Sequence, residues 1–291
     1  MTTGRFPAPA WLRLGQPAPE EIRGDRMQLH RAVQVVAAFA ASWLEAAPGD
    51  GHKSLEWLPG LGALATRPAG AVRAALALAE PALLVVAGEG SPLGRFPLAG
   101  RTPEEAHAWL EATARPLIPA AGPLAAADEP DLEPGPGSPG RPFRPDPRAS
   151  AELARWYGNA DVALRQAAAG HPDATPVVCW PHGFDIAFQV PLGTVDGQAA
   201  SLSAGMTPGD GTIPDPYWYV TPDPTPEVPP RPDLPGGGGW HDEGWFGAVL
   251  RAEALLADDA GPDQAARARS FLAAALAAAR YVVHATGHRS G

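Results

Sequence analysis

Apolar residues recur at helical spacing in several segments of this chain. In residues 25–44 four apolar side chains fall on one side of a helix. Asp25 stands at its start, where a carboxylate can accept a free backbone N–H. The same pattern predicts further helices over residues 102–116, 149–169 and 262–285.

The second of these helices has a clear start signal. Thr102 stands at the N-cap, Pro103 at the first helical position, and Glu105 three residues after Thr102 completes a capping box. We therefore expect the helix to begin at this point.

Short apolar runs bounded by glycine and proline predict strands in both halves of the chain. Apolar and polar residues alternate after residue 184, which places Asp185 on the face opposite Phe184 and Ile186. The long strand 177–190 is expected to bend at Pro181 and Gly183. The predicted strands span residues 55–58, 72–78, 83–87, 96–98, 177–190, 199–206, 217–220 and 247–250.

The order helix, strands, helix occurs twice, which predicts an α+β fold with antiparallel sheets packed against helices. The two halves are expected to form similar lobes. Residues 116–147 hold ten prolines and four glycines and show no apolar periodicity. We therefore expect an N-terminal lobe over residues 1–118, a Pro/Gly-rich connector over 119–147, and a C-terminal lobe over 148–291.

Composition narrows the class of protein. The 22 basic and 32 acidic residues give a net charge of −10, which disfavours nucleic acid as a partner. The one cysteine, Cys179, excludes an intramolecular disulfide. The first ten residues show no signal peptide, and no apolar run is long enough to span a membrane. A cytoplasmic protein without a membrane partner is expected, and its oligomeric state stays open.

Three segments of the C-terminal half, at residues 180–185, 208–219 and 240–245, are dense in polar and aromatic groups. His241 and Glu243 project to the same side of an extended chain, which suits a general base with its orienting carboxylate, or two metal ligands. Asp185 is a lone charge in an apolar strand and supplies a third group. These three residues are the candidate catalytic residues and, if a metal binds, its ligands; the cofactor stays open.

Aromatic and polar side chains of the same segments suit the walls of a small-molecule pocket. In the first predicted helix, His30 and Gln34 share a face and are candidates for its opposite wall. The candidate ligand-binding residues are Trp180, His182, Tyr217, Tyr219, Trp240 and His30.

Each of these residues also has a structural interpretation. Asp185 is equally compatible with a turn cap or an arginine pair, and His241 and Glu243 with an exposed loop. Tyrosines and tryptophans most often pack in a core. His30 and Gln34 are compatible with a satisfied polar pair at a helix border.

The chain resembles an uncharacterised bacterial family that is classified only as a domain of unknown function (number 5996). The resemblance covers residues 25–285 and implies no activity, cofactor or substrate. In that family the Phe184-Asp185 pair belongs to the pattern, while the position of His182 can hold other residues. The motifs on which the resemblance to this family rests are Leu29-His30-x-x-x-Gln34, Trp57-Leu58-Pro59, Trp180-Pro181-His182-Gly183-Phe184-Asp185, Pro208-Gly209-Asp210 with Pro216-Tyr217-Trp218-Tyr219, and Trp240-His241-Asp242-Glu243-Gly244-Trp245.

The residues together favour a small-molecule pocket in the C-terminal half. Its enzymatic version is a hydrolase or another acid/base reaction on a small organic substrate, with or without a metal. The alternative is a non-catalytic ligand-binding or protein-interaction module.

Overall fold

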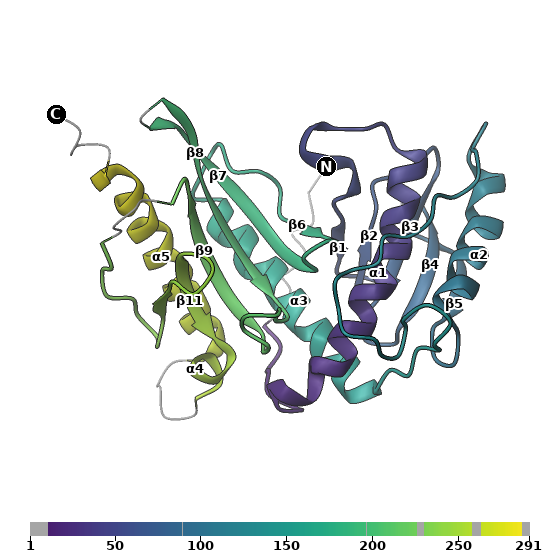
Figure 1. Cartoon of the computed structure of the whole chain (residues 1–291), viewed down its shortest axis with the longest axis horizontal. Coiled ribbons are helices and arrows are strands. Elements are labelled where there is room, and N and C mark those ends of the chain that lie inside the picture. The colour runs from purple at the N-terminus through teal and green to yellow at the C-terminus, as the bar shows by residue number, and fades with distance from the viewer. Residues whose placement is uncertain (1–10, 89, 196, 226–229, 258–262, 287–291) are drawn as a thin grey trace, which may run out of the picture.

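The computed structural model describes residues 11–88, 90–195, 197–225, 230–257 and 263–286. The fold is α+β, as predicted: helices accompany two antiparallel sheets that lie side by side (Figure 1). The residues of the signal-peptide expectation, 1–10, and the predicted helix start at Pro262 lie outside the described residues. No helix within the described ranges is long and apolar enough to cross a membrane.

The N-terminal lobe contains a five-stranded meander in the order β1-β2-β3-β4-β5. Two helices, α1 (Arg23–Trp43) and α2 (Pro103–Ala114), pack against it. Thr102 caps α2 with the predicted capping box. The strands are β1 (Glu56–Leu58), β2 (Ala63–Ala65), β3 (Val72–Ala77), β4 (Ala82–Ala87) and β5 (Pro92–Pro97), and short 3-10 helices lie at η1 (Pro19–Ile22), η2 (Pro48–Lys53) and η3 (Arg115–Leu117).

The C-terminal lobe contains a six-stranded sheet in the order β10-β11-β9-β8-β7-β6. Two long helices, α3 (Pro147–Ala168) and α5 (Gln264–Thr286), pack against it, and a short helix α4 (Ala252–Leu256) follows β11. The strands are β6 (Val178–Trp180), β7 (Asp185–Val195), β8 (Gln198–Thr207), β9 (Tyr217–Asp223), β10 (Gly239–His241) and β11 (Gly247–Arg251).

The two sheets meet edge to edge where Leu55 pairs with Cys179 in an antiparallel bridge. The Leu55 N–H donates to the Cys179 carbonyl at 2.9 Å, and the Cys179 N–H donates back at 2.7 Å. Next to this junction, Trp57 of β1 stacks on Tyr157 of α3 at 6.2 Å between ring centroids. One apolar cluster includes buried residues of both lobes. The lobes therefore share a core.

Two local predictions were wrong. Residues 177–190 do not form one bent strand: β6 and β7 pair antiparallel and turn at residues 181–184, because Pro181 and Gly183 stop the strand. Asp25 does not cap α1, which starts two residues earlier and follows a 3-10 turn. Its carboxyl group instead accepts from the Asp146 N–H at 3.0 Å and from the Ser150 hydroxyl at 2.5 Å, at the start of α3.

The connector contains little regular structure, yet it is attached along the N-terminal lobe. The Trp43 indole donates to the Gly122 carbonyl at 3.1 Å, and a His107 ring nitrogen lies 2.6 Å from the Ala125 carbonyl. Phe143 is buried and pairs with Ala99. The segment is therefore a packed part of the lobe, held largely through its backbone N–H and carbonyl groups.

Candidate functional site

The helices cover one face of the C-terminal sheet, where Ile186 and Phe188 join the shared core. The opposite face carries Asp185, Tyr217 and Tyr219. Its apolar residues form a separate cluster that includes the loop residue Ile213. No residue of a described helix belongs to this cluster. We call this opposite surface the loop face.

The centre of the loop face is a contact between Tyr219 on β9 and Asp185 on β7. The Tyr219 hydroxyl donates a hydrogen bond to the Asp185 carboxyl group. The phenol crosses β8 directly over Gly205, which pairs with Tyr219 in the sheet register. A Cβ at position 205 would lie only 2.6 Å from the Tyr219 hydroxyl oxygen. The missing side chain of Gly205 therefore lets the tyrosine reach the carboxyl group.

Burial dominates the electrostatics of this pair. Desolvation raises the pKa of the Asp185 carboxyl, while the Tyr219 hydroxyl and the nearby His182 imidazole oppose that rise. Burial and the adjacent Asp185 raise the pKa of the Tyr219 phenol well above its usual value. Among the described residues, Asp185 forms no ion pair. Asp185 is half-buried, and no cationic side chain in the described part of the chain lies within ion-pair distance of its carboxyl group.

The turn at 181–184 positions Asp185 and is fixed by α1 and α3. His30 places a ring nitrogen 3.0 Å from both the Pro181 and the His182 carbonyls. Its ring stacks on Phe184 at 5.4 Å. The Tyr157 hydroxyl donates to the Phe184 carbonyl at 2.5 Å. His30 therefore contacts the turn from the side of α1, and its ring nitrogen contacts the backbone carbonyls of the turn. It does not line the loop face.

Burial also determines the protonation of His30. Desolvation lowers the pKa of the imidazole from 6.5 to about 4, although the two carbonyls favour the charged ring. The Gln34 amide donates to the Pro181 carbonyl at 2.6 Å. Both polar side chains are therefore satisfied by the backbone of the turn, in agreement with the structural interpretation.

The loop at 208–216 borders the site and is tied to the start of α1. Arg26 donates to the Gly209 carbonyl. Arg23 makes a two-point ion pair with Asp215, with nitrogen–oxygen distances of 2.7 and 2.9 Å. Asp210 accepts from the Tyr217 hydroxyl at 2.5 Å. Sequence reasoning missed both arginines; their position at the polar start of an otherwise apolar helix was the available signal.

A row of rings connects the predicted site residues across the loop face. His241 lies 4.5 Å from Trp245, Trp245 stacks on Tyr217 at 6.0 Å, and Tyr217 lies 6.2 Å from Tyr219. Tyr219 then contacts Asp185. Four of the predicted residues, His241, Tyr217, Tyr219 and Asp185, therefore lie on one surface, but they are spread along it.

The expected polar centre of Asp185, His241 and Glu243 does not form. A ring nitrogen of His241 lies 2.9 Å from the backbone carbonyl of Glu243, whose side chain is exposed. Asp185 lies four strands from His241, about 19 Å across the sheet. No group of three or more metal-ligating side chains occurs in the described part of the chain. Although Glu243 follows His241 by two residues, the imidazole of His241 contacts the backbone carbonyl of Glu243 and not its carboxylate.

Of the remaining predicted residues, two lie beside Asp185 and one does not. Trp180 pairs with Asp185 in the β6–β7 register, and its ring lies 6.1 Å from that of the exposed His182. Trp240 stacks on Phe246 at 5.1 Å and donates its indole N–H to the Pro232 carbonyl at 2.8 Å. It neighbours His241 in an extended strand and so projects to the other face.

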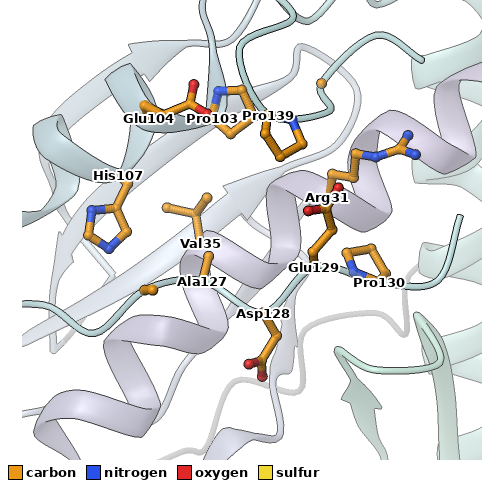
Figure 2. A pocket seen from close by; sticks show the side chains of 12 residues that line it. Arg31, Val35, Pro103, Glu104, His107, Ala127, Asp128, Glu129, Pro130 and Pro139 are labelled. Atoms are coloured by element: carbon orange, nitrogen blue, oxygen red, sulfur yellow. The ribbon is translucent and has the colours of Figure 1, made fainter. Parts of the chain in front are cut away.

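The structure also forms a pocket that sequence reasoning missed (Figure 2). It has a volume of about 360 Å³ and lies between α1, α2 and the connector. The available signal was Arg31, a charge beside the long apolar run of α1. The pocket is lined by Arg31, Val35, Pro103, Glu104, His107, Ala126, Ala127, Asp128, Glu129, Pro130, Gly137 and Pro139.

Comparisons of the chain with protein-family models, with curated proteins and with solved structures find no match. The resemblance to the uncharacterised bacterial family stays a prediction.

Proposed function

We propose that the loop face of the C-terminal sheet binds a small organic molecule with a basic nitrogen, and that Asp185 is its anionic anchor. The observation that carries this proposal is a half-buried carboxyl group that is hydrogen-bonded by Tyr219 and forms no ion pair among the described residues. Burying a charge without a partner costs free energy, and a bound cation removes that cost.

The side chains around Asp185 suit a cation attached to an organic body. The Trp180 ring lies opposite on β6, and Tyr219 lies across β8. Aromatic faces attract organic cations, by about 0.5–2 kcal/mol for each well-placed ring. The net charge of −10 favours the approach of cations to the whole surface.

We propose that this surface binds its ligand and does not catalyse a reaction on it. An acid/base reaction needs a base within hydrogen-bond reach of the reacting proton. The His241 ring contacts the backbone of Glu243 and lies tilted against the Trp245 ring, far from Asp185. The non-catalytic ligand-binding alternative is therefore the better-supported version.

The test is a thermal-shift screen with paired probes: alkylamines, arylalkylamines, guanidines and quaternary ammonium compounds, each matched to a neutral alcohol of the same shape. We expect at least one cationic probe to raise Tm while its neutral partner does not. Asp185→Asn should abolish that shift. Tyr219→Phe should weaken the affinity for the cation about tenfold, because one hydrogen bond contributes about 1 kcal/mol or slightly more.

The matched control is Asp242→Asn, because Asp242 is exposed and its 2.5 Å ion pair with Arg231 lies outside the loop face centre. This variant should bind the cation like the wild type. Equal binding by the wild type and Asp185→Asn, or no cationic probe that binds, would refute the proposal.

A further inference from the structure

The pocket between α1, α2 and the connector has the size of a small-ligand site, because such sites span about 300–1,000 Å³. Figure 2 shows Arg31 and His107 at opposite ends of the lining residues, with Val35 and Ala127 between them. The walls between the two ends are thus largely apolar.

Arg31 is the unusual residue of this pocket. It is only 5% exposed. Its guanidinium donates to the backbone carbonyls of Leu132 and Glu133, at 3.4 and 2.5 Å. Its Nε atom is buried and has no hydrogen-bond partner within the described ranges. Among the described residues, no carboxylate forms an ion pair with it.

A buried guanidinium that contacts only neutral carbonyls carries an uncompensated charge. Burial accordingly lowers the pKa of Arg31, and the nearby Glu129 offsets this only from a distance. Arg31 therefore brings an unpaired positive charge to the lining of the pocket. A bound anion compensates that charge.

We propose that this pocket binds a small organic carboxylate with an apolar body, and that Arg31 holds the carboxylate group. The apolar body would contact Val35, Ala127 and the lining prolines. The N-terminal turn of α2, at Pro103 and Glu104, lies on the same pocket and favours negative charge.

The remaining charges of the pocket limit the ligand to one negative charge. Glu104, Asp128 and Glu129 also line it, and they repel a phosphate dianion more than a monocarboxylate. Glu104 is already engaged, because its carboxylate accepts from the Gly140 N–H at 2.9 Å. Arg31 is therefore the group left to select the ligand.

Isothermal titration calorimetry with butyrate, isovalerate and phenylacetate tests this inference, with the corresponding primary amides and inorganic phosphate as counter-probes. We expect at least one carboxylate to bind, its amide not to bind, and phosphate to bind more weakly. Arg31→Gln should weaken carboxylate binding at least tenfold. Arg67→Gln, an exposed arginine outside the pocket lining, should leave it unchanged.

A second variant covers the case in which Arg31→Gln does not fold. Ala127→Trp keeps the arginine and fills the pocket from the connector, so it should abolish carboxylate binding. Asp185→Asn should bind the carboxylate like the wild type, which separates this inference from the cation site. The inference is overturned if no carboxylate binds, if amides or phosphate bind equally well, or if both pocket variants bind normally.

Discussion

The hydroxyl of Tyr219 reaches the carboxyl group of Asp185 from two strands away, over the bare backbone of Gly205. Three strands are thereby coupled at one point of the loop face. The pair combines a donor that keeps its proton with a carboxyl group that resists losing one.

Gly205→Ala should disrupt this arrangement. A Cβ at this position would lie 2.6 Å from the Tyr219 hydroxyl oxygen and 2.7 Å from the Ile186 carbonyl oxygen. Because backbone is one of the two neighbours, we expect a loss of about 1–3 kcal/mol in the free energy of unfolding. Urea denaturation measures it. Gly211→Ala is the control, since a Cβ there meets nothing within 4 Å; equal losses in both variants would contradict the prediction.

Asp185→Asn should change how stability depends on pH. Folding raises the pKa of this carboxyl, so the folded chain holds the proton more tightly than the unfolded chain. The protonated Asp185 carboxyl then makes its full contribution to stability below the pKa of the unfolded chain, about 3.9. This contribution is lost as the pH rises through the pKa of the folded chain. The wild type should therefore lose stability relative to Asp185→Asn as the pH rises above about 4.

Urea titrations at several pH values, followed by tryptophan fluorescence, check this difference. Asp242→Asn serves as the comparison, because an exposed ion pair contributes no more than about 1 kcal/mol. A difference between the wild type and Asp185→Asn that stays constant with pH would show that burial does not control this carboxyl.

His30 should give the opposite dependence on pH. Burial lowers the pKa of its imidazole to about 4, so the unfolded chain binds the proton more tightly. Stability is then complete above about pH 6.5 and declines as pH falls toward the folded value, by up to about 3 kcal/mol. His30→Gln keeps a donor for the 181–184 turn and should remove most of this decline.

The matched control for His30→Gln is His284→Gln, because His284 is an exposed histidine on α5. Comparing the two variants isolates the effect of burying His30 on the decline in stability at low pH. The result would be contradicted if both variants retained the wild-type decline between pH 6.5 and pH 4.

The bridge between the sheets predicts a pattern of hydrogen exchange. The Leu55 and Cys179 amides hydrogen-bond to each other's carbonyls, and one apolar core continues past them. We expect both amides to exchange only through global unfolding, at the same free energy as Ala75 and Ala204 in the sheet centres. Exchange of the two bridge amides at a clearly lower free energy would mean that the lobes open separately.

The sequence alone determined the four long helices and the class of the fold, but not the short helix α4. Apolar spacing and the Thr102 capping box are local signals, because a helix closes its hydrogen bonds within a few residues. The periodicity over residues 25–44 and 149–169 therefore predicted α1 and α3 closely. Alternation after residue 184 also placed Asp185 on the face opposite Ile186.

Only the tertiary structure decided which of these residues meet. Tyr219 reaches Asp185 because of the β7–β8–β9 register and the glycine between them, which no local pattern contains. His241 and Asp185 share a surface but are separated by the strand order, so the predicted polar centre did not form. The pocket at Arg31 exists because the connector folds back over α1 and α2. Contacts between distant segments depend on register and chain path, and these are set by the packing of the whole core.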